Sequence, residues 1–198
     1  LIPRYYDVTK GSVKVDGVDV RDMTQKELRD KLGYVPQKGV LFSGTIDSNI
    51  RYGKPEITDA QVKEAAEVAQ ATEFIDTKPE KYESPVSQGG TNVSGGQKQR
   101  LSIARAIAKD PEIFIFDDSF SALDFKTDSQ LRKALKEYTK DATTVIVAQR
   151  ISTILGADQI IVLDDGHMAG IGTHKELMAN CEVYQQIARS QLSEEELA

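Results

Sequence analysis

The chain has 198 residues, of which 39% are hydrophobic and 28% charged, and its formal net charge is -6. This acidic balance argues against a general nucleic-acid-binding surface, which needs a basic face. The single cysteine, Cys181, excludes an internal disulfide framework and fits a reducing compartment. The longest apolar runs, such as "IFIF", fall far short of the roughly 18 residues that a membrane-spanning helix needs. The composition suits one globular domain or two closely packed lobes.

The first 40 residues predict a hairpin, a helix and a strand, in that order. The segment "GSVKVDGVDV" (11–20) alternates like a strand pair around Asp16-Gly17, a favoured hairpin turn. The segment "MTQKELRDKL" (23–32) predicts a helix that begins with a capping box. A short strand, "GYVPQ", follows it.

The next stretch, residues 46–93, is mainly helical and ends in a loop. From residue 46 to about residue 78 the pattern is helical, and residues 79–93, rich in Pro, Gly and Ser, indicate an ordered loop. Because the stretch 46–90 contains no convincing strand, we expect it to form a separate helical lobe inserted into an α/β core.

After residue 96 helices and apolar strands alternate regularly. Such an alternation predicts an α/β fold, with a parallel sheet covered by helices on both faces. The expected elements are a helix at 97–109, the strand "EIFIFDD", a helix at 127–139, the strand "TTVIVAQ", a short helix at 152–156, the strand and hairpin "QIIVLDDGHMAGIG", and a last helix capped by Thr173 and Glu176.

Polar side chains follow three of these strands at the point where each strand ends. Asp117 and Asp118 end "IFIFDD", Gln149 ends "TTVIVAQ", and Gln37 ends "YVPQ". Ligands of open α/β sheets bind beyond the carboxyl ends of the strands. A buried strand that stops in acids is typical of the Walker B motif, in which the first carboxylate holds the Mg²⁺ of a bound nucleotide. The alternative is that the two aspartates only cap the following turn, and that Gln37 is an ordinary loop residue.

The segment "SGGQ" begins a helix in an unusual way. Ser94 and Gln97 form a capping-box pattern. The first turn between them consists of Gly95 and Gly96, each roughly 1 kcal/mol worse than Ala inside a helix. A helix N-terminus carries unpaired N–H groups and partial positive charge, so a first turn without side chains lets an anion approach the backbone. The segment therefore favours a phosphate site, and the alternative is a flexible loop that happens to precede a helix.

Five motifs occur in the order "YVPQ", "VSGGQKQR", "IFIFDD", "SALD" and "VAQR". In that order they closely resemble the nucleotide-binding domain of ABC transporters, and "VPQKGVLFSGTIDSNIRYG" resembles the exporter branch of the family. The resemblance covers essentially the whole chain. It implies a RecA-like parallel-sheet core formed by residues 1–40 and 107–198, with an inserted helical subdomain, 41–106, that carries the signature motif.

The resemblance also implies cofactors, partners and site residues. In the family, two such domains sandwich two nucleotides and drive transport by a transmembrane domain, so we expect ATP, Mg²⁺, a second nucleotide-binding domain and a transmembrane domain, at the cytoplasmic face of the cell membrane and without nucleic acid. The resemblance implies that the signature residues contact the γ-phosphate of the partner's ATP; these are Ser94, Gly95, Gly96 and Gln97. It places Gln37 near Mg²⁺ and the membrane domain. It makes Asp117 the metal-binding Walker B carboxylate and Asp124 the cross-interface aspartate.

Two positions assigned to catalysis depart from the family pattern. The catalytic Glu of the family falls on Asp118, which is shorter by one carbon–carbon bond, roughly 1.5 Å. The switch His falls on Gln149, which cannot carry a proton. Together they imply the degenerate half of a heterodimeric multidrug exporter. Its own site would bind ATP and hydrolyse it slowly or not at all, and its signature motif would complete the site of the partner.

The start of the chain gives a further expectation. The sequence opens on Leu1, and the family places its Gly-rich Walker A loop just before a segment like "LIPRYYD". We therefore expect a fragment that begins just after Walker A, in which the N-terminal part of the core is missing, a gap lies beside "EIFIF", and the chain alone binds ATP poorly and is inactive.

Two other functions stay open at this point. A DNA-maintenance ATPase head shares the signature and Walker B motifs, although such heads carry long coiled coils between their halves. A non-hydrolysing binding and dimerisation module would use the same surfaces. ATPase assays of the full-length chain, alone and with partners, separate the transporter subunit from the module.

Overall fold

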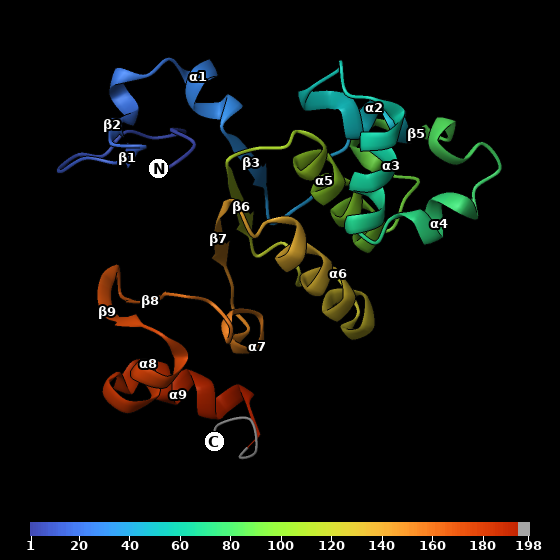
Figure 1. Cartoon of the computed structure of the whole chain (residues 1–198). Helices are drawn as coiled ribbons and strands as arrows, with labels where there is room; N and C mark the ends of the chain where they lie inside the picture. Colours follow the sequence, from blue (N-terminus) through green and yellow to red (C-terminus); the bar gives the residue numbers. More distant parts are fainter. Residues whose placement is uncertain (194–198) are drawn as a thin grey trace. The chain divides into compact units, whose positions relative to one another are not determined.

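The computed structural model describes residues 1–193, which fall into two compact units, one from Leu1 to Val147 and one beginning at Ala148 (Figure 1). The strands of the first unit are β1 (Lys14–Val15), β2 (Val18–Asp19), β3 (Leu32–Val35), β4 (Gly44–Thr45), β5 (Pro85–Val86), β6 (Ile113–Asp117) and β7 (Thr143–Val147). Its helices are α1 (Gln25–Asp30), α2 (Ile46–Ile50), α3 (Asp59–Val68), α4 (Thr72–Asp76), α5 (Gly95–Ala108) and α6 (Phe125–Tyr138), with short 3₁₀ turns at 20–22, 51–53, 81–83 and 88–90.

A three-stranded parallel sheet in the order β3-β6-β7 forms the centre of the first unit. Side chains on the central strand alternate between two apolar clusters. Phe114 and Phe116 join the cluster formed with α5 and α6, whereas Ile115 joins the cluster formed with α1 and the β1-β2 hairpin. Because both faces of the sheet are covered, the predicted α/β class with a parallel sheet is confirmed.

The helical stretch packs around α5, which contacts both α2 and α3 (Figure 1). The helical pattern predicted from residue 46 to about residue 78 consists of α2, a 3₁₀ turn, α3 and α4. Pro55 lies in the first break, where its ring and its missing N–H prevent a helix from continuing. The expectation that 46–90 holds no strand is wrong, because β5 pairs antiparallel with β4.

Arg105 of α5 fastens the segment that follows β3 to the helices. Its guanidinium donates to the carbonyls of Asn49 and Val40, both at 2.8 Å, and lies 5.2 Å and 5.5 Å from the ring centroids of Phe42 and Tyr52. Burial lowers the pKa of Arg105 to about 10. The half-buried cation is thus satisfied by backbone acceptors and aromatic faces together.

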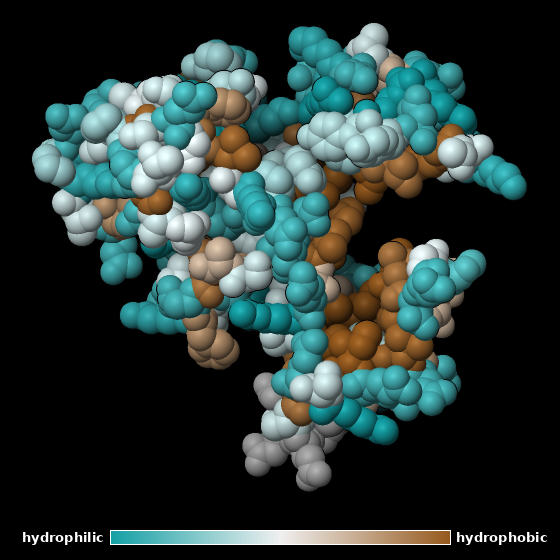
Figure 2. Space-filling view, turned by 180° about the vertical axis from the view of Figure 1, so that it is seen from behind, coloured by the Kyte–Doolittle hydropathy of each residue, from teal (hydrophilic) through white to brown (hydrophobic). Residues whose placement is uncertain are grey.

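The outer strand β7 is the poorly covered part of the sheet. We expected a gap beside "EIFIF" (112–116), yet β6 is paired on both sides, and its phenylalanines are buried. Exposure falls instead on β7, where Val147 is 52% exposed, and Figure 2 shows apolar surface there. The expectation of a gap beside β6 is therefore wrong, because β6 is the central strand and β7 the edge.

The second unit contains α7 (Ile151–Ile154), β8 (Ile160–Asp164), β9 (His167–Gly172), α8 (His174–Asn180) and α9 (Glu182–Gln191). The predicted hairpin at Asp165-Gly166 and the predicted capping box of Thr173 and Glu176 are confirmed. Among the described residues β8 pairs only with β9 and adds no strand to the parallel sheet. The expected single last helix is two, which meet at Cys181. No helix within residues 1–193 is long and apolar enough to span a bilayer.

Candidate functional site

The carboxyl ends of β3 and β6 bring three of the predicted site residues together. Gln37 donates from Nε2 to Oδ2 of Asp118 at 3.0 Å. Beside this pair, the hydroxyl of Tyr34 donates to Oδ2 of Asp117 at 3.2 Å. Burial raises the pKa of the Tyr34 phenol, and its hydrogen bond to Asp117 raises that pKa further. The predicted convergence of Gln37, Asp117 and Asp118 at one sheet edge is thus what the structure shows.

The turn after β6 has a defined backbone. The N–H of Asp118 donates to the carbonyl of Val147 at 2.8 Å, and the buried hydroxyl of Ser119 donates to the carbonyl of Val35 at 2.9 Å. Asp118 has a φ of 44°, a left-handed conformation that Asp and Asn adopt more readily than other side chains do. The carboxylates at this edge are therefore held by a fixed turn.

The donor set at this edge fits Mg²⁺. Carboxylate and amide oxygens are the ligands that Mg²⁺ prefers, and Mg²⁺ usually takes one or two carboxylates and completes its shell with phosphate oxygens and water. No group of three or more His, Cys, Asp or Glu within residues 1–193 could hold a metal ion by itself. Asp117, with Gln37 beside it, would therefore hold Mg²⁺ together with the phosphates of a nucleotide, and the ion would supply charge neutralisation there.

Helix α5 begins with a first turn that is exposed to open space and is stabilised by a capping box. Ser94 Oγ accepts from the N–H of Gln97 at 3.2 Å, and Gln97 Oε1 accepts from the N–H of Ser94 at 3.1 Å. A Cβ added at Gly95 would meet no atom within 4 Å. The hydroxyl proton of Ser94 and the first N–H groups of a 14-residue helix thus lie beside open space, a geometry that suits an anion.

Asp124 lies next to this turn. A Cβ added at Gly96 would lie 3.4 Å from the carbonyl oxygen of Ala122, so the two segments are neighbours. Asp124 caps α6, accepting from the N–H of Thr127 at 3.0 Å and from its hydroxyl at 2.7 Å. These hydrogen bonds hold the pKa of Asp124 below its usual range. Asp124 is thus also the N-cap of α6, a role that was not predicted from the sequence.

Gln99 is a residue of this surface that the sequence reasoning missed. Its side chain, 2% exposed, donates from Nε2 to the carbonyl of Pro36 at 3.2 Å and accepts at Oε1 from the N–H of Gly39 at 3.1 Å. The helix that carries Ser94 thereby clamps the loop on both sides of Gln37. The available signal was a polar residue on the apolar face of the predicted helix.

Replacing Gln99 by Leu should destabilise the first unit by about 1–3 kcal/mol, because the N–H of Gly39 and the carbonyl of Pro36 lose their partner in a buried place. Urea unfolding followed by circular dichroism measures the change. Gln186→Leu, at an exposed position of α9, is the matched control and should stay within about 0.5 kcal/mol of the wild type. Equal midpoints for the two variants would contradict the clamp.

Gln149 belongs to the second unit, whereas the other predicted site residues belong to the first. Its carbonyl accepts from Nε2 of Gln191 at 2.9 Å, and Oε1 of the same Gln191 accepts from the N–H of Ile151 at 2.9 Å. Helix α9 thus fixes the turn that carries Gln149.

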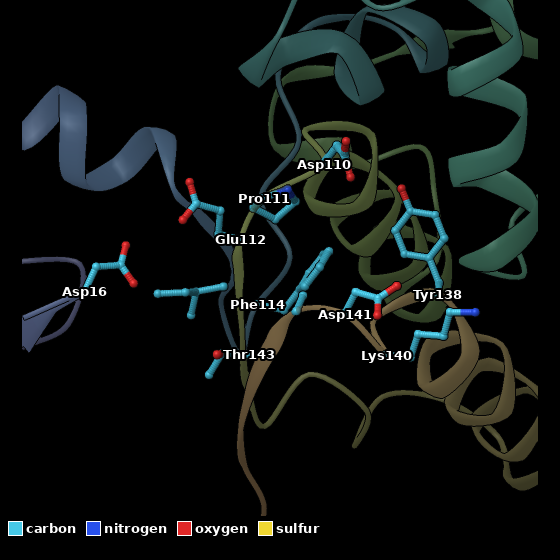
Figure 3. A pocket seen from close by; sticks show the side chains of 11 residues that line it. Asp16, Asp110, Pro111, Glu112, Phe114, Tyr138, Lys140, Asp141 and Thr143 are labelled. Atoms are coloured by element: carbon cyan, nitrogen blue, oxygen red, sulfur yellow. The ribbon is translucent and has the colours of Figure 1, made fainter.

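A cavity of about 820 Å³ lies at the other end of the sheet, where β6 and β7 begin (Figure 3). Its lining includes Asp110, Glu112, Tyr138 and Asp141. Ligands of parallel α/β sheets bind at the carboxyl ends of the strands, so the cavity is on the wrong side for the predicted chemistry. The candidate site is therefore the edge formed by Gln37, Asp117 and Asp118, with the open turn at Ser94 as a second surface.

An α/β domain with a parallel sheet and a polar edge at the carboxyl ends of its strands is a fold that nucleotide-binding domains share. The family model described as ABC transporter matches residues 1–121. The chain belongs to the ABC transporter family.

Several relatives are similar over almost the whole chain. An ABC transporter ATP-binding protein of Mycobacterium tuberculosis is 48% identical and is aligned over 96% of this chain and 33% of the relative. A multidrug export ATP-binding/permease protein of Staphylococcus aureus is 46% identical over 94% of this chain and 32% of the relative. The solved structure of a bacterial Atm1-family ABC exporter with ATP bound matches at a TM-score of 0.93 and 39% identity, over 98% of this chain and 34% of that one. The chain thus spans about a third of the length of these relatives.

Proposed function

We propose that this chain is the ATP-binding part of an ABC exporter, which closes with a second ATP-binding domain around ATP and Mg²⁺ to drive export. The observation that carries the proposal is the open first turn of α5, with Ser94 and Gln97 in a capping box around Gly95. This turn offers N–H groups and a hydroxyl to a phosphate of a second nucleotide, distinct from the nucleotide at the chain's own Asp117. The names of the relatives, which describe exporters, support the same function.

In this proposal the two surfaces serve two nucleotides. Asp117, aided by Gln37, holds the Mg²⁺ of the nucleotide in the chain's own site. Ser94, Gly95, Gly96 and Gln97 contact the γ-phosphate held by the partner domain, and Asp124 lies at the interface between the two domains. The position of Gly96 beside the carbonyl of Ala122 supports a common surface for the turn at Ser94 and for Asp124.

We further propose that the chain's own site hydrolyses ATP slowly and that the partner is a different chain. Asp118 has a shorter side chain than the usual catalytic Glu, and its carboxylate accepts a hydrogen bond from Gln37. A base must approach its water to about 2.6–3.2 Å, which a shorter side chain cannot easily do. Gln149 can donate and accept hydrogen bonds but cannot carry a proton.

The remaining parts of the proposal concern the assembly. The partners are a second ATP-binding domain and a transmembrane domain, and the location is the cytoplasmic face of the cell membrane. Residues 41–106 act as a helical subdomain between the two parts of the core, 1–40 and 107–198. Formal net charge -6 gives no support to the alternative, a DNA-maintenance ATPase head.

The experiment is a comparison of ATP hydrolysis by the full-length protein alone and in a co-purified complex with a second ATP-binding subunit. The proposal expects slow turnover alone and a rate about 100-fold higher in the complex, since loss of a well-placed base typically costs 10²–10⁴-fold. Rapid turnover by the protein alone would contradict the degenerate site. No ATP binding in either sample would contradict the function itself.

A further inference from the structure

Tyr34 touches the carboxylate that the proposed function assigns to the metal. Its hydroxyl donates to Oδ2 of Asp117 at 3.2 Å, from the neighbouring strand. We propose that Tyr34 is a positioning residue, which holds Oδ2 of Asp117 so that Oδ1 faces the divalent cation of the bound nucleotide. This inference rests on the proposed function, because it needs a nucleotide and a cation at Asp117.

The register of the sheet puts the two side chains on one face. Tyr34 of β3 lies opposite Ile115 of β6. Side chains two residues apart in a strand point to the same face, so Ile115 and Asp117 share the face of Tyr34. Diagonal neighbours on adjacent strands lie within reach of an aromatic side chain. The contact therefore follows from the register and not from the chance rotation of an exposed side chain.

The ring of Tyr34 is itself held in place. Tyr5 packs its edge against Tyr34, with the ring centroids 5.8 Å apart and an interplanar angle of 65°. The guanidinium of Arg29 lies 5.2 Å from the centroid of the Tyr5 ring, and its Nε donates to the carbonyl of Pro3 at 3.3 Å. The phenol thus reaches Asp117 from a supported position, as a group that orients a ligand must.

The neighbouring contacts support a role in orientation. Gln37 donates to Asp118, and Ser119 donates to the carbonyl of Val35, so the ends of β3 and β6 are tied by side chains beyond the last paired residues. The hydroxyl of Tyr34 adds a hydrogen bond to Asp117 itself. Because one carboxylate oxygen of Asp117 is held by a hydrogen bond, the carboxylate cannot rotate freely about its Cβ–Cγ bond. Its second oxygen therefore keeps one orientation.

The test is Tyr34→Phe in the full-length protein, which removes the hydroxyl and keeps the ring against Tyr5. Binding of Mn²⁺, used as a paramagnetic probe in place of Mg²⁺, is titrated by electron paramagnetic resonance with a non-hydrolysable ATP analogue present. We expect Mn²⁺ affinity to fall about tenfold, as is typical for loss of a partner that orients a metal ligand. Affinity for the analogue in the presence of a chelator should stay at the wild-type value.

Two further variants sharpen the test. Tyr52→Phe, at an exposed tyrosine that contacts Phe42 and Arg105, is the matched control and should leave Mn²⁺ affinity unchanged. Tyr5→Ala, at another exposed position, loosens the support of Tyr34 and should give a smaller loss in the same direction as Tyr34→Phe. Wild-type Mn²⁺ affinity in Tyr34→Phe would overturn the inference and leave the proposed function standing. A wild-type protein that binds neither nucleotide nor Mn²⁺ would overturn both.

Discussion

Replacing Gly95 by Ala should lower the ATP hydrolysis rate of the assembly formed with the partner about 100-fold, the typical cost of losing one preorganised donor to a developing anion. The added methyl group would meet no protein atom within 4 Å, so it occupies only the space that we assign to the partner's phosphate. The same change replaces Gly by the best helix former and should leave the stability equal or up to about 1 kcal/mol higher. Steady-state ATPase rates and urea unfolding measure the two effects.

The expected loss of ATPase activity without a loss of stability makes this prediction selective, because a variant that merely disturbs the fold loses both. Gly156→Ala is the matched control, since a Cβ there also meets no atom within 4 Å and the position has no assigned role. It should leave the ATPase rate unchanged. A Gly95→Ala assembly with the wild-type rate would show that nothing approaches this turn during hydrolysis.

Restoring the family's residues at the two divergent positions should produce the second large effect. The double variant Asp118→Glu with Gln149→His should raise hydrolysis at the chain's own site at least about 100-fold, because one well-placed acid or base group alone contributes typically 10²–10⁴-fold. The measurement is single-turnover hydrolysis in an assembly whose other site has been inactivated. An unchanged rate would show that other features keep this site slow.

The backbone at Asp118 requires a control of its own. A longer side chain at a φ of 44° brings some strain. Asp165 has the same φ of 44° in the β8-β9 hairpin, so Asp165→Glu imposes a comparable strain away from the site. This control should change the unfolding midpoint about as much as Asp118→Glu does and should leave hydrolysis unchanged.

The sequence predicts well those features that depend on local patterns. The capping boxes at Thr24, Ser94 and Thr173 are all present, since each needs only two side chains three residues apart. The hairpin at Asp16-Gly17 follows from the turn dipeptide. The convergence of Gln37 on Asp118 follows from a general rule for parallel sheets.

Features that depend on distant partners were not predicted. The pairing of β5 with β4 joins two-residue segments about 40 positions apart, and no periodicity can reveal it. The position of the exposed edge at β7 depends on strand order, which the alternation of strands and helices leaves open. The contact of Tyr34 depends on strand register, so a tyrosine in a strand carries no sign of it. Gln99 stands out in the sequence only as a polar residue on the apolar face of a helix, and this pattern does not reveal its partners.

A cryo-electron microscopy structure of the full-length assembly with ATP and Mg²⁺ would show whether the turn at Ser94 binds the partner's phosphate. We expect a γ-phosphate oxygen of the partner's nucleotide within about 3 Å of Ser94 Oγ and of the N–H of Gly96, the distance of a normal hydrogen bond. A closed, ATP-loaded assembly in which this turn faces bulk water, with no phosphate near it, would contradict the account.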